Sequence, residues 1–220
     1  MFGRKRSLDE ARMLMVKKQL VARHISDPRV LKAMREIPRH RFVEEQYWPA
    51  AYDDSPVPIG YDQTISQPFI VAFMTQALCL PSDRPTKVLE VGTGSGYQAA
   101  VLSCLASKVY SVERIEPLAQ RAQHVLYELD IDNVEIRVND GGYGWQEHSP
   151  YDGIIVTAAA PEIPAPLKVQ LKDGARLVAP IGPKKQQQLL RLQRQGDHIV
   201  QETLVPVAFV PLLGEHGWAK

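Results

Sequence analysis

Apolar and polar positions follow two alternating patterns from residue 87 onward. Short apolar runs predict strands at 87–91, 108–112, 133–138, 152–157 and 174–181. Longer segments with apolar positions three or four apart predict helices at 95–106, 116–129 and 163–171, and 139–150 is predicted to be a loop. Strands that alternate with helices pair in a parallel sheet with helices on both faces. We therefore predict an α/β fold with a doubly wound, mostly parallel sheet.

The segment before residue 87 is predicted to be largely helical. Apolar positions at helical spacing favour helices at 8–23 and 29–37. The second helix is preceded by Ser26-Asp27-Pro28, which offers a capping oxygen and a first-turn proline. A further helix is predicted from Pro68 to Leu80, whereas the prolines within 38–62 favour a loop.

The C-terminal part of the chain changes to a strand pattern. Residues 187–194 and 198–205 flank a Gln-Gly-Asp turn and predict a β-hairpin, and 208–212 predicts one more short strand. We treat these strands and the N-terminal helices as elaborations of one domain. Its predicted parts are an N-terminal helical and loop region at 1–80, a core at 87–182 and C-terminal strands at 183–220.

Composition narrows the classes of function. The 220 residues are enough for one sizeable α/β domain, and 45% hydrophobic residues are typical of a globular protein. A net charge of +1 creates no broad field toward nucleic acid or a membrane. No apolar run approaches the roughly 20 residues of a spanning helix. We expect a monomer with no nucleic-acid partner and no membrane partner.

The N-terminus and the cysteines bear on the compartment. The basic stretch Arg4-Lys5-Arg6 is followed by charged residues and not by the apolar core of a signal peptide. Cys79 and Cys104 lie in apolar helical contexts and are expected to be buried free thiols, which fits a reducing cytoplasm. Neither the cysteines nor the histidines have the paired spacing of metal ligands. We expect a cytoplasmic protein without a metal.

The stretch 87–98 carries the strongest chemical signal. Its strand runs directly into Gly92, Gly94 and Gly96, and a helical pattern follows. This is the first turn of a nucleotide-binding α/β unit, in which glycine lets the backbone approach a ligand closely. A dinucleotide fingerprint needs a small residue where this chain has Tyr97, so the loop departs from that class. An ordinary tight turn between strand and helix is the alternative.

Two acidic residues indicate which kind of ligand the glycine loop binds. Glu90 ends the strand, and a carboxylate there suits a ligand with positive charge, such as S-adenosylmethionine (SAM), which has an ammonium and a sulfonium. Glu113 follows the next strand, about 20 residues beyond the glycine turn, where an acid typically accepts hydrogen bonds from ribose hydroxyls. The alternative for Glu113 is a solvated charge at a helix start.

Three further segments make the pattern specific. They are Ile59–Pro68 (IGYDQTISQP), Asp140-Gly141 and Tyr151–Pro161 (YDGIIVTAAAP). Together with Glu90–Gly96 (EVGTGSG), they closely resemble the protein-L-isoaspartate O-methyltransferase family, over about residues 8–213. The glycine loop alone would fit any SAM-dependent methyltransferase, whereas TISQP and VTAAAP are specific to this family.

The resemblance implies a Rossmann-like enzyme that uses SAM, releases S-adenosylhomocysteine and acts on isoaspartyl-containing peptides and proteins. It methylates the free carboxylate of L-isoaspartyl residues, and the ester closes to a succinimide that hydrolyses partly to normal aspartate, which repairs aged proteins. The catalytic serine of the family falls on Ser66. Its substrate contacts fall on Gln63, Thr64, Ile65, Thr157 and Ala158. Its cofactor contacts fall on Gln67, Pro68, Glu90, Gly92, Thr93, Gly94, Ser95, Gly96, Glu113, Arg114, Asp140 and Gly141. The family commonly has Gly-Asp-Gly where this chain has Asn139-Asp140-Gly141.

The implied chemistry needs few catalytic groups. The attacking carboxylate has an unperturbed pKa of about 4 and is ionised at neutral pH, so no general base is required. A hydroxyl such as that of Ser66 can hold one carboxylate oxygen, whereas a lysine or arginine clamp would also stabilise the ground state. Ser66 could instead cap the helix that starts near Pro68.

For several other candidate residues, a structural role is an alternative to a role in binding. Asp140 could form a turn, Gln63 could be solvated, and Thr64 could simply favour a strand. Thr157 and Ala158 could serve close packing and not the substrate. The loop with Tyr143, Trp145 and His148 could stack on adenine or anchor itself. The segment 209–212 could bind a peptide through its backbone.

Two other functions remain open at this point. One is a SAM-dependent methyltransferase for a small molecule or nucleic acid, and the other is a SAM-binding module without catalysis. The neutral net charge argues against nucleic acid, and the TISQP segment argues against a small molecule.

Overall fold

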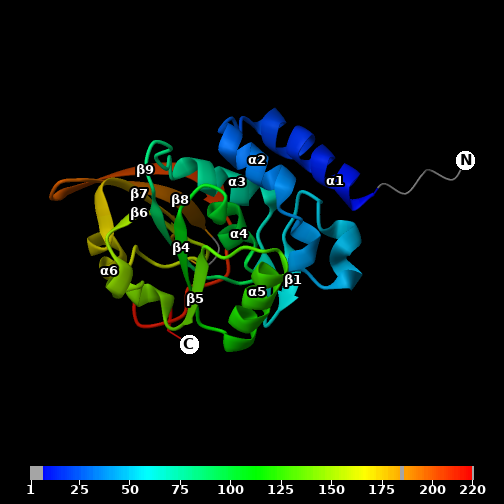
Figure 1. Cartoon of the computed structure of the whole chain (residues 1–220). Coiled ribbons are helices and arrows are strands. Elements are labelled where there is room, and N and C mark those ends of the chain that lie inside the picture. The colour runs from blue at the N-terminus through cyan, green and yellow to red at the C-terminus, as the bar shows by residue number, and fades with distance from the viewer. Residues whose placement is uncertain (1–6, 184–185, 220) are drawn as a thin grey trace, which may run out of the picture.

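One sheet of seven strands organises the chain in the computed structural model, which describes residues 7–183 and 186–219 (Figure 1). The basic stretch Arg4-Lys5-Arg6 lies outside the described residues. The strands are β3 (Lys87–Val91), β4 (Lys108–Glu113), β5 (Val134–Val138), β6 (Tyr151–Val156), β7 (Leu171–Ile181), β8 (Gln187–Gln195) and β9 (His198–Val207). Their order is β5-β4-β3-β6-β7-β8-β9, parallel up to β7 and antiparallel beyond it. The predicted mostly parallel sheet is confirmed.

The strand order reverses in the middle of this sheet. From β3 the chain moves outward through α4 (Tyr97–Ser103) and α5 (Glu116–Glu128) to β5. From β6 it moves outward in the other direction through α6 (Ala165–Val169) to β7. At such a reversal the connections leave on opposite sides, which opens a crevice at the carboxyl ends of the strands. The crevice between β3 and β6 is therefore the expected ligand site.

Side chains of the central strands alternate between two buried layers. Val88 and Ile155 pack in the layer that contains α3 (Pro68–Ala77) and α4, whereas Leu89 and Ile154 pack in the layer that contains Leu167 of α6. Both faces of the sheet are covered, which explains why the central strands are almost uniformly apolar.

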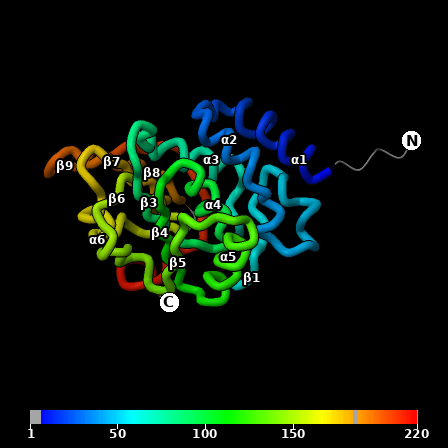
Figure 2. The backbone as a smooth tube through the Cα atoms, viewed as in Figure 1, coloured from blue at the N-terminus to red at the C-terminus, as the bar shows by residue number. Residues whose placement is uncertain are grey.

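The N-terminal helices extend the layer of α3 and α4. α1 (Leu8–Met15) begins with a capping box between Ser7 and Glu10, and α2 (Pro28–Glu36) begins at Asp27, whose carboxylate accepts the N–H of Arg29 at 2.9 Å. After α1 the helical path continues through a π turn and a 3₁₀ turn, Val16–Leu20 and Val21–Arg23. The predicted helices at 8–23 and 29–37 are confirmed. Figure 2 shows α1 and α2 beside α3, far from the C-terminal end of the chain.

The segment 38–62 is more ordered than the predicted loop. It contains the 3₁₀ helices Arg39–Phe42 and Glu45–Ala50, followed by β1 (Val57–Gly60), which pairs antiparallel with β2 (Gln63–Ile65). Val57 and Ile59 are buried while Pro58 points outward, so this proline is compatible with a short two-stranded ribbon. A loop was predicted because of the prolines, and the alternation of buried and exposed residues that forms the ribbon was not recognised.

The C-terminal hairpin is confirmed, but the short strand predicted at 208–212 is wrong. β8 and β9 join at Gly196-Asp197 and extend the main sheet. Residues 208–212 instead cross the carboxyl end of β6 through two backbone hydrogen bonds. Ala159 N–H donates to Val210 O at 2.8 Å, and Leu212 N–H donates to Ala159 O at 2.7 Å. The segment therefore lies over the crevice.

The two cysteines are exposed, and the prediction of buried thiols is wrong. α3 ends at Ala77, and Cys79 follows in a left-handed conformation with φ of 47°. Cys104 is the C-cap of α4. Both residues lie just beyond the helices whose apolar periodicity suggested burial.

The described residues contain no group of three or more histidine, cysteine or acidic side chains placed to hold a metal ion. None of their helices combines the length and apolar character that crossing a membrane requires.

Candidate active site

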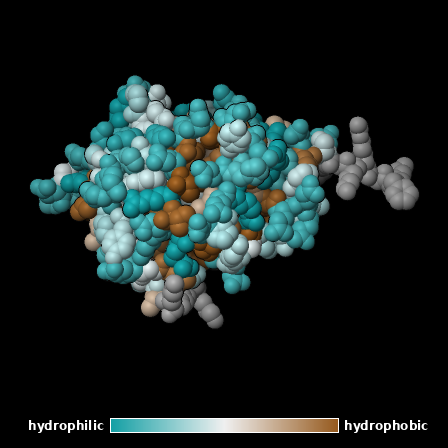
Figure 3. Space-filling view, turned by 60° about the horizontal axis from the view of Figure 1, so that its bottom comes forward, coloured by the Kyte–Doolittle hydropathy of each residue, from teal (hydrophilic) through white to brown (hydrophobic). Residues whose placement is uncertain are grey.

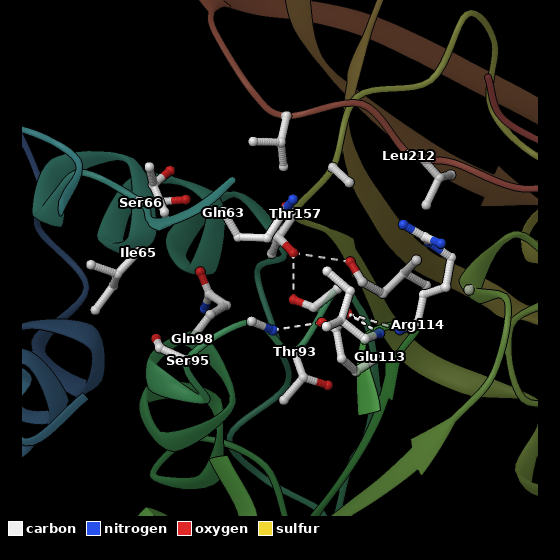
Figure 4. Close-up of a pocket in the computed structure, with 18 of the residues that line it drawn as sticks. Gln63, Ile65, Ser66, Thr93, Ser95, Gln98, Glu113, Arg114, Thr157 and Leu212 are labelled. Atoms are coloured by element: carbon white, nitrogen blue, oxygen red, sulfur yellow. Dashed lines mark hydrogen bonds between the residues drawn. The ribbon is translucent and has the colours of Figure 1, made fainter. Parts of the chain in front are cut away.

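A cleft opens where the strand order reverses, between the glycine loop after β3, the β4–α5 turn and the segment that follows β2 (Figure 4). It is open to solvent at its mouth and is lined by both polar and apolar side chains. Residues 210–213 complete the wall on the side of β6. In the space-filling view, apolar side chains gather in a band across the middle of the face drawn (Figure 3).

The three positions of the glycine loop share one backbone requirement and differ in their surroundings. All three glycines have positive φ, with 97° at Gly92, 53° at Gly94 and 89° at Gly96. A Cβ on Gly92 would collide with the hydroxyl of Thr157, and one on Gly96 would lie 3.0 Å from Ala122 Cβ on α5. A Cβ on Gly94 would meet nothing closer than 3.5 Å, so this position faces the open cleft. The loop is packed at its ends and accessible at its centre.

Glu113 holds the turn between the glycine loop and α5. Its Oε2 accepts the N–H of Gly94, and its Oε1 accepts the N–H groups of Arg114 and Ile115, each at 2.8 Å. The side chain lines the cleft and is only 7% exposed, so the alternative of a solvated surface charge is wrong. The carboxylate lies where ribose hydroxyls are expected at this kind of turn.

Glu90 is buried behind the glycine loop and does not form the cleft wall. Its Oε2 accepts the hydroxyl proton of Ser111, and Ser111 Oγ lies 2.6 Å from Thr93 Oγ1. Its Oε1 has no hydrogen-bond partner among the described residues. Burial raises the pKa of Glu90 to about 8, the Ser111 hydrogen bond opposes the rise, and the Glu113 carboxylate adds to it. An unpaired buried acceptor beside the cleft fits a cofactor that carries positive charge.

The β1–β2 hairpin brings the expected substrate residues to the cleft. Thr64 and Ser66 line it, and their hydroxyls make no hydrogen bond to any described residue. The N-cap of α3 is Gln67, so Ser66 does not cap this helix. On the outer side of the hairpin, Arg121 of α5 donates to the carbonyl of Ile59, which ties the hairpin to the cofactor half.

The end of β6 forms the floor between these two groups. Thr157 Oγ1 lies 2.6 Å from Gly92 O and 3.0 Å from Val91 O, so its hydroxyl donates across to the glycine loop. Ala158 follows on the cleft wall with a small, nearly buried side chain. Thr157 therefore packs against the loop and lines the cleft at the same time.

Asp140 lies just outside the cleft, under the C-terminal turn of the chain. Its Oδ1 accepts the N–H of Gly142 at 2.8 Å, and its Oδ2 accepts the N–H of Glu215 at 3.0 Å. A Cβ on Gly214 would collide with the same carboxylate. Asp140 thus forms the predicted turn and also holds residues 214–215 beside the cleft.

Most predicted site residues meet in one place. Those on the cleft wall are Gln63, Thr64, Ile65, Ser66, Gly92, Thr93, Gly94, Ser95, Glu113, Arg114, Gly141, Thr157 and Ala158. Glu90, Gly96, Pro68 and Asp140 are not on it. Gln67 faces a second hollow, where its amide donates to Asp54 O at 3.0 Å. This hollow, the side groove, adjoins Ser66 and is lined by Pro56, Ile70 and residues 206–210.

Several wall residues were not predicted from the sequence. They are Val71, Val91, Tyr97, Gln98, Val112, Ile115 and Leu213, whereas 210–212 belong to the segment 209–212 that was expected to bind a peptide. Gln98 donates to Thr75 Oγ1 at 2.8 Å. Ser111 was also missed, although a lone hydroxyl in the apolar strand β4, in register with Glu90, was a usable signal.

The aromatic loop after β5 is an anchor. The ring of His148 stacks on Tyr110 of β4 with centroids 4.0 Å apart, and Trp145 meets the same ring edge-on at 5.5 Å. Neither residue lines the cleft. Tyr143 bonds the carboxylate of Glu215, so it steadies the C-terminal turn.

Comparison with known proteins agrees with this geometry. The sequence profile of the protein-L-isoaspartate(D-aspartate) O-methyltransferase (PCMT) family matches residues 10–217. The chain belongs to this family. A protein-L-isoaspartate O-methyltransferase of Syntrophotalea carbinolica is 53% identical over 209 residues, which cover 94% of this chain and 95% of that protein. Membership confirms the predicted methyltransferase class and SAM as its methyl donor.

Solved structures agree with the fold of this PCMT chain. One protein-L-isoaspartate O-methyltransferase is 30% identical and superposes with a TM-score of 0.84, covering 96% of this chain and 67% of that one. A β-aspartate methyltransferase structure from Plasmodium falciparum, in complex with S-adenosyl-L-homocysteine, is 24% identical with a TM-score of 0.79 and covers 95% and 99%. The Rossmann-like architecture is thereby confirmed.

Proposed function

We propose that this PCMT chain transfers the methyl group of SAM to the free carboxylate of L-isoaspartyl residues in damaged peptides and proteins, with Ser66 as the residue that holds the carboxylate. Family membership supports the reaction. One observation supports Ser66 above all. Its hydroxyl has no partner among the described residues and lies where the cleft meets the side groove.

Positioning accounts for the catalysis in this proposal. The bound cofactor supplies an activated methyl group. Ser66 and Thr64 would hold one oxygen of the substrate carboxylate by hydrogen bonds and would leave the other oxygen free to act as the nucleophile. Because the carboxylate is already ionised at neutral pH, no side chain has to remove a proton.

A neutral clamp suits this chemistry. Among the described wall residues Arg114 is the one cation, and its guanidinium lies on the Leu212 side of the cleft, away from Ser66 (Figure 4). A cation on the substrate carboxylate would stabilise the ground state and weaken the nucleophile. Hydroxyl donors orient the carboxylate without that penalty.

The side groove suits the residues that flank the isoaspartyl group. It shares Thr64, Ser66, Thr157 and Val210 with the cleft, and the remaining wall is largely apolar. A substrate chain along 206–210 would place its abnormal carboxylate at Ser66. Ala208→Trp should then raise the KM for an isoaspartyl peptide and leave SAM affinity unchanged, since Ala208 is exposed in the groove and absent from the cleft wall. An unchanged peptide KM would remove the groove from the substrate path.

The remaining expectations are also proposals. We propose that 1–220 acts as a single domain, as a monomer in the cytoplasm, without nucleic acid or membrane. The small net charge supports the last two points. Light scattering after size-exclusion chromatography tests the monomer, and a stable dimer would overturn it.

Methyl transfer from labelled SAM to a short isoaspartyl peptide tests the proposed activity. The matched control is the same peptide with normal aspartate. Transfer to the isoaspartyl peptide alone is expected, and Ser66→Ala should lower it. SAM binding without transfer to either peptide would favour a binding module, and transfer to an unrelated acceptor would favour another substrate class.

A further inference from the structure

Glu90 combines complete burial with an unused acceptor. Its side chain has no exposed surface, its Oε2 accepts from Ser111, and its Oε1 meets no donor among the described residues. Its neighbours Val91 and Gly92 form the cleft wall. The carboxyl group therefore lies one layer behind the ligand site, with hydrogen-bonding capacity left over.

No cation of the described chain offsets a charge on Glu90. On β4, the register partner is Ser111, and the ionisable group that acts on Glu90 is Glu113, which has the same sign. On β6, the register partner is Ile155. From α4, which covers this face, Tyr97 directs its phenol to Met34 Sδ at 3.6 Å, and burial raises its pKa above the ordinary value, so it adds no charge. From α3, Thr75 is neutral and bonded to Gln98.

An ionised Glu90 would be a buried charge without a counterion. Such a charge is costly, and a buried acid avoids the cost by keeping its proton. The raised pKa of about 8 agrees with this geometry. In the ligand-free protein at neutral pH, Glu90 is therefore mainly neutral.

We propose that binding of SAM is coupled to ionisation of Glu90: the carboxyl group is neutral when the site is empty and ionised, with its proton released, when SAM is bound. The O–H bond of the carboxyl group breaks, its electron pair stays on the carboxylate, and the proton passes to solvent. This inference rests on the proposed function only through its cofactor and is independent of the substrate.

The hydroxyl chain beside Glu90 gives the carboxylate a partner and connects it to the cleft wall. Ser111 donates to Glu90, Thr93 Oγ1 lies 2.6 Å from Ser111, and Thr93 is on the cleft wall. Ser111 is thus a positioning residue, because its hydrogen bond favours the ionised form of Glu90 over the neutral form. It also fixes Oε2, which leaves Oε1 as the free acceptor.

Calorimetric titration with SAM at pH 7, in two buffers of different ionisation enthalpy, measures the proton directly. With a pKa of about 8, the free protein should release about 0.9 of a proton per SAM bound. Glu90→Gln should release close to none beyond what SAM itself contributes, because glutamine cannot ionise. The Kd of the wild type relative to that of Glu90→Gln should fall about ninefold from pH 6 to pH 7 and about fivefold from pH 7 to pH 8.

A second ligand tests which part of the cofactor is sensed. 5′-Methylthioadenosine keeps the nucleoside and a neutral thioether but lacks the ammonium and the sulfonium. It should bind the wild type without proton release. Release equal to that of SAM, or equal release by the wild type and Glu90→Gln, would overturn the proposal.

Ser111→Ala covers the case in which Glu90→Gln does not fold. Loss of this hydrogen bond should move the pH midpoint of SAM binding upward, whereas a merely structural role would change the affinity equally at every pH. Infrared difference spectra should show loss of a protonated carboxyl band when SAM binds, and no such loss would contradict the inference. Proton release without methyl transfer to an isoaspartyl peptide would contradict the proposed substrate and would leave the inference about Glu90 intact.

Discussion

Replacing Glu90 by glutamine should remove a pH-dependent loss of stability from the ligand-free protein. The ordinary pKa of this acid is 4.5, and burial raises it to about 8 in the folded chain. The folded state therefore binds the proton more tightly than the unfolded state. Protonated Glu90 stabilises the folded state relative to ionised Glu90. This stabilisation is fully present below the ordinary pKa of the acid and is lost as the pH rises through its pKa in the folded state.

The size of the effect follows from the same two values. The difference between 4.5 and about 8 corresponds to roughly 5 kcal/mol between the fully protonated and fully ionised limits. This is an upper bound, because water entry and local relaxation soften the environment of an ionised buried group. Most of the change falls between pH 5 and pH 8.

Urea unfolding at several pH values measures this contribution as a difference. The free energy of unfolding of wild type minus that of Glu90→Gln should fall by up to about 1.4 kcal/mol per pH unit across this window, then level off above pH 8. Other groups titrate equally in both proteins and cancel. Glu116→Gln, at an exposed position, controls for the type of substitution. A difference independent of pH would refute the reasoning.

Three further substitutions test the geometry. Ser66→Ala should lower turnover on an isoaspartyl peptide about 10- to 100-fold, for loss of a hydrogen bond to a charged group, with little change in SAM affinity; an unchanged rate removes Ser66 from the mechanism. Glu113→Ala should weaken SAM by about 1–3 kcal/mol in calorimetry, and unaltered affinity would show that its backbone contacts are its whole role. Gly214→Ala should cost about 1–3 kcal/mol of unfolding free energy, because its Cβ would collide with the Asp140 carboxylate. Gly196→Ala, whose Cβ meets nothing within 4 Å, should cost less, and equal losses would contradict this account.

Periodicity and glycine chemistry were sufficient to predict the central sheet. The central strands β3, β4 and β6 are almost completely buried because both of their faces are covered, and their short apolar runs are easy to recognise. The segments predicted incorrectly depend on contacts distant in sequence. Residues 208–212 pair with Ala159 at the end of β6 and not with a neighbouring strand, and periodicity within the segment carries no information about that partner. Cys79 is exposed because the chain leaves the helix two residues earlier.

The site was predictable where a residue acts through its own backbone or its position at a strand end. Gly92, Glu113 and Thr157 follow from the rule that ligands bind at the carboxyl ends of parallel strands. Gln98 could not be predicted, because it reaches the cleft through packing between elements, and the segment 209–212 was expected to bind a peptide but not to line this cleft. Asp140 was expected among the cofactor contacts, and its contact with Glu215 depends on a turn at the other end of the domain.

The two acids of the cofactor site show why residue identity alone does not define a role. Glu90 and Glu113 lie on adjacent strands, are both almost completely buried, and are indistinguishable as residue types. Glu113 accepts three backbone N–H groups, which compensate for its burial and let it organise the turn. Glu90 has one hydroxyl donor and one empty acceptor, so the same burial favours its neutral form. In the empty site Glu90 is neutral, and a bound cationic ligand would favour its ionised form. The number of hydrogen-bond donors around each carboxylate therefore distinguishes Glu113, which organises the turn, from Glu90, which would ionise when the ligand binds.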